Sequence, residues 1–282
     1  IRMESTIIAN KYRIVSKIGS GQFGTIYHGK YLKKDESVAI KTEHKDCELQ
    51  TLKHEANILN YLYSKGSTNT PSVYWFGTCD TNFTLIMPLY EMSLEDMIQN
   101  HEVSKMRIMK IGSKMIDILE TIHRFGILHR DIKPQNFMMR NNELYLIDFG
   151  LSTVYMDDKY NICPKRPDSW EILGTPKFVS IRIHEGEDPS RSDDCISVIY
   201  ILQYLLQDGH VHWENVQEEQ TKNEYSENHI LYYKNAIRKQ LKTQHLNEIH
   251  GTTCCGMILE YLYGNTFCEQ PKYQWIRSLL HA

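Results

Sequence analysis

Residues 129–136 read His-Arg-Asp-Ile-Lys-Pro-Gln-Asn, and twelve residues further along the chain residues 148–150 read Asp-Phe-Gly. The first segment places a carboxylate (Asp131), a lysine two residues later (Lys133) and an amide five residues later (Asn136) in one loop. The carboxylate can orient a hydroxyl and accept its proton, the lysine can neutralise a migrating phosphoryl group, and the amide can bind a metal ion. The loop therefore predicts a site for phosphoryl-group chemistry.

The second segment begins with Asp148, directly after the apolar run 144–147, which is typical of a buried strand. A carboxylate at the end of that strand can bind Mg²⁺ bridging two phosphates of a nucleotide. The alternative is that the two segments are unrelated turns. The order and spacing of the glycine and lysine elements upstream argue against that alternative.

A glycine cluster further upstream reads Gly19-Ser20-Gly21-Gln22-Phe23-Gly24 and fits the pattern GxGxxG. A Walker loop would require lysine after the last glycine, where this chain has Thr25. A dinucleotide fold would require a following helix and an acidic residue about 20 positions on; Glu43 meets the second condition, but residues 25–27 are typical of a strand. Strand, loop and strand predict a glycine flap over nucleotide phosphates, with a plain glycine hairpin as the alternative.

A third strand over residues 37–41 ends in Lys41, on the face opposite to Val38 and Ile40. From there the ammonium group can reach the α- and β-phosphates of a nucleotide. Glu55, on a helix predicted over residues 51–63, can pair with it and hold it in place. The alternative for such a pair is two solvated surface charges.

The apolar periodicity divides the chain into a strand-rich part up to about residue 90 and a helical remainder. No low-complexity linker separates the parts, so we expect two lobes joined by a short hinge, an arrangement that favours a ligand cleft. Predicted strands cover 12–18, 25–27, 37–41 and 83–89; predicted helices cover 51–63, with a stripe at Leu52, Ala56, Leu59 and Tyr63, and a later segment with a stripe at Ile108, Ile111, Met115, Ile118 and Ile122.

Composition is ordinary for a folded chain of 282 residues, with 41% hydrophobic and 24% charged residues, which argues against disorder. The formal net charge of −3 provides no basic footprint for nucleic acid. Seven scattered cysteines and no signal peptide predict a reduced, intracellular protein. The longest apolar run, Cys195–Leu206, is too short to span a bilayer, so no membrane association is expected.

These motifs resemble the eukaryotic protein kinase superfamily over essentially the whole chain, and within it the casein kinase 1 group. Most protein kinases have Ala-Pro-Glu where this chain has Ser-Ile-Arg at 180–182; the casein kinase 1 group typically has Ser-Ile-Asn, so the chain departs only at Arg182. The tau-tubulin and vaccinia-related kinases are alternative groups. The closer resemblance rests on Gly19–Tyr27, Ser93–Asp96, His129–Met139, Gly174–Thr175 and Phe178–Ile181.

The resemblance implies an α+β, two-lobed protein kinase fold in a single catalytic domain over residues 1–282. A small antiparallel sheet with one helix would form the lobe at about 1–89, and helices the lobe at about 90–282. It implies transfer of the γ-phosphoryl group of Mg-ATP to serine or threonine hydroxyls of proteins, by a monomer. Lys133, two residues after Asp131, matches the serine/threonine pattern.

The resemblance also assigns residues to the site. Asp131, Lys133, Lys41 and Glu55 would be catalytic, and Asn136 and Asp148 would bind Mg²⁺. Gly174, Thr175 and Lys177 would contact substrate, and Asp194 would anchor the catalytic loop. ATP would contact Ile18, Gly19, Ser20, Gly21, Gln22, Phe23, Gly24, Ile26, Ala39, Lys41, the gatekeeper Met87, and Pro88 and Tyr90 of the hinge.

Departures from the group concern substrate choice and regulation. Lys177 and Lys222 match a basic cluster that captures phosphorylated substrates, but Thr221 and Glu224 stand where the pattern is basic, so we expect weak discrimination for such substrates. We expect constitutive activity, although the activation loop at 151–173 contains hydroxyl groups that could be phosphorylated, at Ser152, Thr153, Tyr155, Tyr160 and Ser169.

Two other functions are alternatives to this interpretation. A pseudokinase scaffold would lack Lys41, Asp131 or Asp148, and all three are present. A small-molecule kinase of the choline or aminoglycoside type would not be expected to combine Lys133 with a Gly-Thr segment. The neighbouring Cys254 and Cys255 are interpreted as buried thiols, with a strained redox pair as the alternative.

Overall fold

The computed structural model describes residues 7–21, 24–47, 49–100, 103–157, 159–167, 172–214 and 227–281. The chain forms two compact units. Unit 1 combines Ile1–Ser93 with Phe137–Ser152, and unit 2 combines Leu94–Asn136 with Thr153–Ala282. The predicted lobe boundary at residues 89 and 90 stays a prediction.

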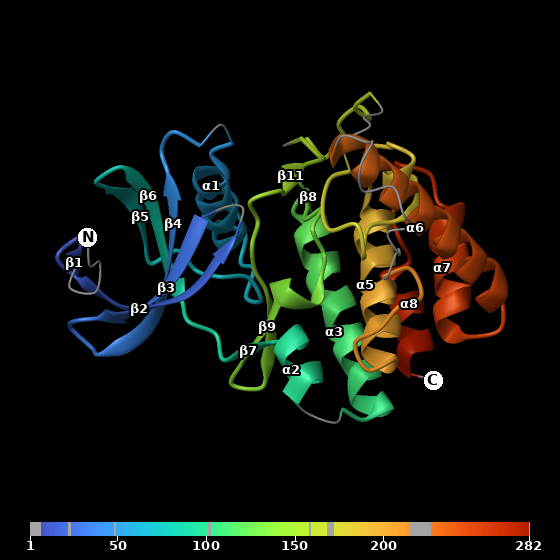
Figure 1. The fold of residues 1–282 in the computed structure, drawn as a ribbon, viewed down its shortest axis with the longest axis horizontal. Helices are drawn as coiled ribbons and strands as arrows, with labels where there is room; N and C mark the ends of the chain where they lie inside the picture. Colours follow the sequence, from blue (N-terminus) through green and yellow to red (C-terminus); the bar gives the residue numbers. More distant parts are fainter. Residues whose placement is uncertain are drawn as a thin grey trace. The chain divides into compact units, whose positions relative to one another are not determined.

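Unit 1 contains a six-stranded antiparallel sheet (Figure 1). The alternation that predicts its strands is confirmed: Val38 and Ile40 are buried on the face that packs against Tyr12 and Ile14, and Lys41 lies on the other face. The strands, in their order across the sheet, are β1 (Ile7–Ile8), β2 (Tyr12–Gly21), β3 (Gly24–Tyr31), β4 (Glu36–His44), β6 (Asn82–Pro88) and β5 (Trp75–Cys79).

The helix of this unit, α1 (Thr51–Ser64), packs on β4 and β6 and is covered on its inner face by apolar side chains, as predicted. One member of the predicted stripe is wrong, because Tyr63 is exposed and Leu62 is buried in its place. Helical periodicity alone would place Tyr63 on the same face as Leu59, but Tyr63 is the last residue but one of α1, and the buried stripe ends at Leu62.

A second, three-stranded sheet of unit 1 holds the residues that precede the Asp-Phe-Gly segment. Its strands are β7 (Met92–Ser93), β9 (Phe137–Arg140) and β10 (Glu143–Leu146), in the order β10, β9, β7. The end of β10 is held by Asn69, whose side-chain amide donates to Leu144 O and whose carbonyl accepts from Leu146 N, both at 2.9 Å. The buried strand predicted before Asp148 is confirmed.

Unit 2 is mainly helical, and α3 (Lys105–Arg124) packs against α5 (Arg191–Leu206) and α8 (Tyr273–His281) (Figure 1). The stripe predicted from Ile108 to Ile122 faces this interior, with Ile111 only partly buried. The helices are α2 (Leu94–Asn100), α3 (Lys105–Arg124), α4 (Ile181–His184), α5 (Arg191–Leu206), α6 (Glu227–Ile249), α7 (Cys254–Gly264) and α8 (Tyr273–His281). A short 3₁₀ turn, Pro134–Asn136, and the paired strands β8 (Ile127–Leu128) and β11 (Thr153–Val154) complete the unit.

Two further observations bear on the sequence analysis. Across the described ranges, no helix has both the length and the apolar character needed to cross a membrane. All seven cysteines are free thiols; Cys255 is buried, but Cys254 is only partly buried, so the prediction of two buried thiols is correct for one of them.

Candidate active site

The glycine cluster of unit 1 lies at the end of β2 and the start of β3, with Gly21 paired to Gly24. The two strands predicted on either side of it are thereby confirmed. At Gly24, where φ is +121°, a Cβ atom would lie 2.0 Å from the carbonyl oxygen of Thr42, so only glycine fits there. Ser20 and Gly19 lie in β2 beside an exposed Ile18, and Ile26 follows in β3. The predicted Gln22 and Phe23 lie outside the described residues.

Lys41 is the centre of the charged cluster in unit 1. Its Nζ lies 2.8 Å from Glu55 Oε2 and 2.8 Å from Asp148 Oδ1. Burial by itself would lower the pKa of Lys41, but the carboxylates of Glu55 and Asp148 outweigh it and hold the pKa above its usual value. Lys41 therefore stays charged, and the alternative of two solvated surface charges is wrong because Lys41 and Glu55 are 8% and 1% exposed.

Asp148 follows β10 with a left-handed backbone, φ +65°, which is uncommon for a residue other than glycine. The next residue is tied to α1, because the backbone N–H of Phe149 donates to Glu55 Oε1 at 3.3 Å. Glu55 thus holds both the lysine and the start of the Asp-Phe-Gly segment. The predicted partners Lys41, Glu55 and Asp148 come together within one unit.

The remaining residues predicted to contact the nucleotide lie along the neighbouring strands of unit 1. Ala39 of β4 is paired in register with Met87 of β6, which is buried. Pro88 is the last residue of β6 and pairs with Val38. Tyr90 follows, is 9% exposed, and packs its ring 5.1 Å from that of Tyr145.

In unit 2 the loop at 129–136 is organised around Asp131, which is 5% exposed. Lys133 Nζ lies 2.6 Å from Asp131 Oδ2, and the Thr175 hydroxyl donates to Asp131 Oδ1 at 2.7 Å. Asn136 Nδ2 donates to the backbone oxygen of Asp131 at 2.8 Å. Four of the predicted residues, Asp131, Lys133, Asn136 and Thr175, therefore form one hydrogen-bonded group.

The loop is fixed from behind by Asp194, in the first turn of α5, as predicted. Its carboxylate accepts the backbone N–H groups of His129 (2.9 Å) and Arg130 (3.0 Å). His123 Nε2 lies 3.0 Å from the same carboxylate, and Tyr273 OH lies 2.7 Å from His123 Nδ1. Although burial would raise it, these hydrogen bonds hold the pKa of Asp194 below its usual value.

The segment at 174–179 contains the other predicted substrate residues. Gly174 has φ +95°, and a Cβ there would lie 2.5 Å from Arg130 O, so close approach to the loop requires glycine. The Lys177 ammonium pairs with Glu214 and lies 4.7 Å from the centre of the Tyr204 ring. Its charge is therefore already partnered. The other basic residue of the predicted cluster, Lys222, lies outside the described residues, as do Thr221 and Glu224.

Two of the predicted phosphorylation sites are wrong. Ser152 is 3% exposed and donates to Phe149 O at 2.6 Å; Tyr155 is 6% exposed and donates to His123 O at 2.6 Å. Neither hydroxyl can be reached without breaking its hydrogen bond. Tyr160 is exposed, Thr153 is partly exposed in β11, and Ser169 lies outside the described residues.

Sequence reasoning missed one residue that positions the cluster. Glu43, considered above only as the acid of a dinucleotide fold, is 2% exposed and accepts the Thr51 hydroxyl at 2.6 Å and the N–H groups of Thr51 and Leu52. It therefore caps the helix that carries Glu55 and neutralises its N-terminal dipole. The cap lies eight residues away in sequence, so a local capping pattern could not reveal it.

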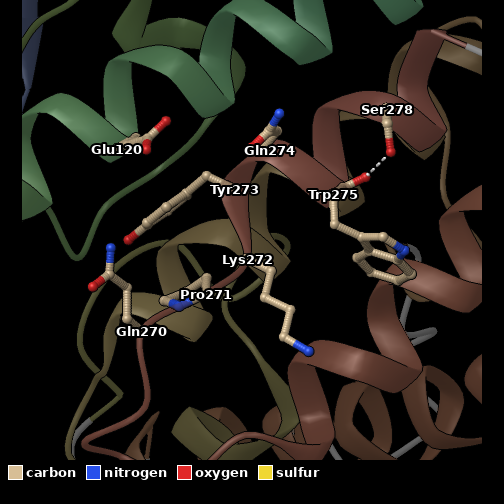
Figure 2. A pocket seen from close by; sticks show the side chains of 8 residues that line it. All are labelled: Glu120, Gln270, Pro271, Lys272, Tyr273, Gln274, Trp275 and Ser278. Carbon is tan, nitrogen blue, oxygen red and sulfur yellow. Dashed lines mark hydrogen bonds between the residues drawn. The ribbon is translucent and has the colours of Figure 1, made fainter.

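A hollow on unit 2 is lined by residues of which only Tyr273 has been described above. It is formed along α8 and the segment before it, opposite Glu120 of α3, and Trp275 and Lys272 project there side by side (Figure 2). None of its lining residues was predicted to belong to the site.

The antiparallel sheet of unit 1 and the helices of unit 2 together have the α+β composition expected of a phosphotransferase of the kind predicted from the sequence. Residues 12–281 match the family described as the protein kinase domain, and the chain belongs to this family. The predicted α+β kinase fold is thereby confirmed.

Members of this family use ATP with a divalent metal ion. The predicted metal residues fit such an ion, because the carboxylate of Asp148 and the amide of Asn136 supply the oxygen atoms that hard cations prefer. Since Asn136 Nδ2 is directed to the Asp131 carbonyl, its amide oxygen is the atom available for a metal.

Proposed function

We propose that this chain is a serine/threonine protein kinase of the casein kinase 1 type, which transfers the γ-phosphoryl group of Mg-ATP to hydroxyl groups of protein substrates. In this proposal Lys41, held by Glu55, binds the α- and β-phosphates. Asp148 and Asn136 hold Mg²⁺, whose charge offsets that developing on the phosphates. Asp131 orients the acceptor hydroxyl and takes its proton, and Lys133 neutralises the group being transferred.

The observation that carries the proposal is that both carboxylate oxygens of Asp131 accept a hydrogen bond from a side chain. Its two carboxylate oxygens accept from Lys133 Nζ at 2.6 Å and from Thr175 Oγ1 at 2.7 Å, while the residue is 5% exposed. A carboxylate oriented from both sides is prepared to receive one hydroxyl in one direction, which is the contribution of positioning to catalysis. The resemblance assigns this lysine and threonine to serine/threonine kinases.

The casein kinase 1 type is supported by the Ser-Ile-Arg segment, including its one departure. Ser180 caps α4 and donates to Asp193 Oδ1 at 2.6 Å, which ties the segment to the first turn of α5. The guanidinium of Arg182 donates to the backbone oxygens of Leu262, Tyr263 and Asn265, at the carboxyl end of α7. A cation at the C-terminus of a helix is favourable. These contacts therefore explain structurally why arginine stands at position 182.

The substrate is proposed to be a protein without an obligatory prior phosphate. The ammonium of Lys177 is paired with Glu214, so a phosphorylated substrate must compete with that carboxylate for it. A matched pair of peptides, one with and one without the upstream phosphate, tests this. We expect the two kcat/KM values to agree within about threefold, and a strong preference for the phosphorylated peptide would overturn this part of the proposal.

The activity itself is tested with radiolabelled ATP on casein, on choline and on an aminoglycoside, using the wild-type chain and Asp131→Asn. We expect transfer to serine and threonine of casein only. Asp131→Asn should lower kcat about 10²- to 10⁴-fold, the range for loss of a general base. Transfer to a small alcohol would favour a small-molecule kinase, and ATP binding without any transfer would favour a scaffold. Unchanged turnover in Asp131→Asn would show that the assignment of Asp131 is wrong.

A further inference from the structure

A lysine in the interior of unit 2 has no part in the function proposed above. Lys242 of α6 is 1% exposed. Its Nζ donates to the backbone oxygens of Pro176 at 2.9 Å and Val179 at 2.6 Å, and it lies 3.2 Å from His184 Nε2. Three acceptors match the three N–H donors of an ammonium group. Buried lysines are rare, and one directed at backbone oxygens calls for an explanation.

Among the residues that the structure describes, the contacts of Lys242 are with neutral groups and not with a carboxylate. The centre of the Tyr200 ring lies 5.0 Å from Nζ and that of Trp213 lies 5.8 Å away, both within the range of cation–π attraction. Burial and then the charge of Lys242 lower the pKa of His184 to about 3, so the imidazole is neutral at pH 7 and can accept a hydrogen bond. Burial and then the charge of Arg238 lower the pKa of Lys242 well below its usual value.

The two carbonyl groups held by Lys242 belong to the segment at 174–179 that contains the predicted substrate residues. A second contact acts on the carbonyl between them, because Trp213 Nε1 donates to Lys177 O at 2.8 Å. The segment is a tight turn, in which Phe178 N and Val179 N donate to Thr175 O at 2.9 and 3.1 Å. Side chains from outside the segment therefore hold three of its carbonyl groups from the interior.

The same segment reaches the loop that carries Asp131. Thr175 Oγ1 donates to Asp131 Oδ1 at 2.7 Å, only one residue before the first carbonyl that Lys242 holds. A chain of direct contacts thus runs from the buried ammonium, through the turn, to the carboxylate. A shift of the turn would move Thr175 and would release one of the two groups that orient Asp131.

We propose that Lys242 is a positioning residue for the protein substrate, which fixes the segment at 175–179 by its backbone so that Thr175 and the surface beside Lys177 meet the incoming chain in one conformation. This inference rests on the proposed function. Because Lys242 acts on the backbone, it sets where the segment lies and does not select a substrate side chain. Loss of its donors should therefore weaken peptide binding and turnover and leave ATP binding unchanged.

The test compares Lys242→Met, which retains length and apolar bulk but lacks all three donors, with Lys239→Met. Lys239 lies one turn earlier on α6, has a side chain that is 40% exposed, and pairs with Glu185, so it is a matched control. In Lys242→Met we expect the KM for a serine peptide to rise about tenfold and kcat to fall, with the KM for ATP within about twofold of wild type. Lys239→Met should leave all three values unchanged.

A readout that needs no catalysis is hydrogen exchange of the amides of Phe178 and Val179, which the turn protects. Their exchange should accelerate in Lys242→Met and not in Lys239→Met. Trp213→Phe, which keeps the ring and removes the N–H, is a milder second variant and should change the same quantities in the same direction by less. If Lys242→Met does not fold, Trp213→Phe replaces it in these measurements.

The outcomes separate the two proposals. Unchanged exchange in Lys242→Met, or in Trp213→Phe if the first does not fold, overturns the role of Lys242 whatever the activity. Faster exchange with an unchanged peptide KM also overturns it. A fall in kcat with both KM values unchanged indicates loss of folded enzyme and counts against it as well. If the wild-type chain phosphorylates no serine or threonine peptide, the proposed function fails, and exchange still decides whether Lys242 holds the segment.

Discussion

Replacing Asp194 with asparagine changes one atom of a buried side chain and perturbs the loop that carries Asp131. The carboxylate accepts from the backbone N–H groups of His129 and Arg130 and from His123 Nε2, at 2.9–3.0 Å. The nearly isosteric amide has only one acceptor oxygen. Because Oδ2 accepts from both His129 and His123, the amide loses least when its oxygen takes that place and its NH₂ group faces the N–H of Arg130.

The cost follows from these contacts. A hydrogen bond to a charged group contributes about 1.5–3 kcal/mol and a neutral one about 1 kcal/mol, and a buried donor left without an acceptor costs a further 1–3 kcal/mol. Asp194→Asn weakens two bonds and replaces the third with a contact between two donors, so we expect the free energy of unfolding to fall by about 4 kcal/mol. For a domain of this size the thermal midpoint should fall by about 8 °C.

We expect kcat of Asp194→Asn to fall by more than the loss of folded protein explains. Arg130 has φ +69°, a backbone conformation that costs about 1 kcal/mol or more for a residue other than glycine and that the bond from its N–H to Asp194 helps to hold. When that bond weakens, the loop relaxes and Asp131 moves with it. A displacement of about 1 Å can cost about 100-fold in rate, so we expect kcat to fall about 10- to 100-fold under conditions in which the variant is folded.

The assays are urea denaturation followed by circular dichroism, and initial rates at saturating ATP. The control is Asp208→Asn, an exposed position just beyond the other end of α5, where asparagine tolerates the existing φ of +52°. It should be indistinguishable from wild type. A loss of less than about 1 kcal/mol in Asp194→Asn, together with wild-type kcat, would refute the view that this carboxylate holds the loop in place.

Two further predictions concern stability. Glu43→Gln keeps one acceptor for the start of α1 but removes the charge at its N-terminus, and should lower the free energy of unfolding by about 1–2 kcal/mol in urea titrations; no change would exclude the cap. His184 has a native pKa of about 3, below its unfolded value, so its contribution is complete above about pH 6.5 and is lost as the pH falls toward 3. Denaturation of His184→Gln between pH 7 and 4 should show a slope shallower than wild type by about 1.4 kcal/mol per pH unit, and identical slopes would contradict the assignment.

The parts of the site that could be predicted from the sequence are those in which chemistry and local spacing coincide. Lys41 lies on the face of its strand opposite to Val38 and Ile40 because alternate residues of a strand point in opposite directions. Asp131, Lys133 and Asn136 meet because they share a loop of a few residues. The predictions that failed depend on burial, which spacing along the segment does not reveal: Tyr155 donates to His123 O, far away in sequence, and Ser152 is buried although its acceptor, Phe149 O, is close in sequence.

The same reason explains the residues that were missed. Glu43 caps a helix from a neighbouring strand, so its role depends on where β4 ends relative to α1. From the sequence alone, Lys242 would be expected at the surface, because lysine side chains are almost always exposed. Nothing in its local sequence indicates that α6 turns this residue inward, toward the backbone at 176–179. Such residues become apparent only once the tertiary contacts are known.

Arg130, with its left-handed backbone, contacts both Asp194 and the segment that begins at Gly174. Its N–H is held by Asp194 from α5, and its carbonyl is approached by Gly174, where a Cβ would come within 2.5 Å of the oxygen. Only glycine at position 174 lets the chain pass this close to Arg130. The close approach brings the next residue, Thr175, within hydrogen-bond distance of Asp131, so Gly174 contributes to the structure of the loop as well as to the segment predicted to contact substrate. The loop that holds the proposed base and the segment that meets the substrate are thus one packed assembly, so a substitution in either should change both kcat and the KM for the peptide.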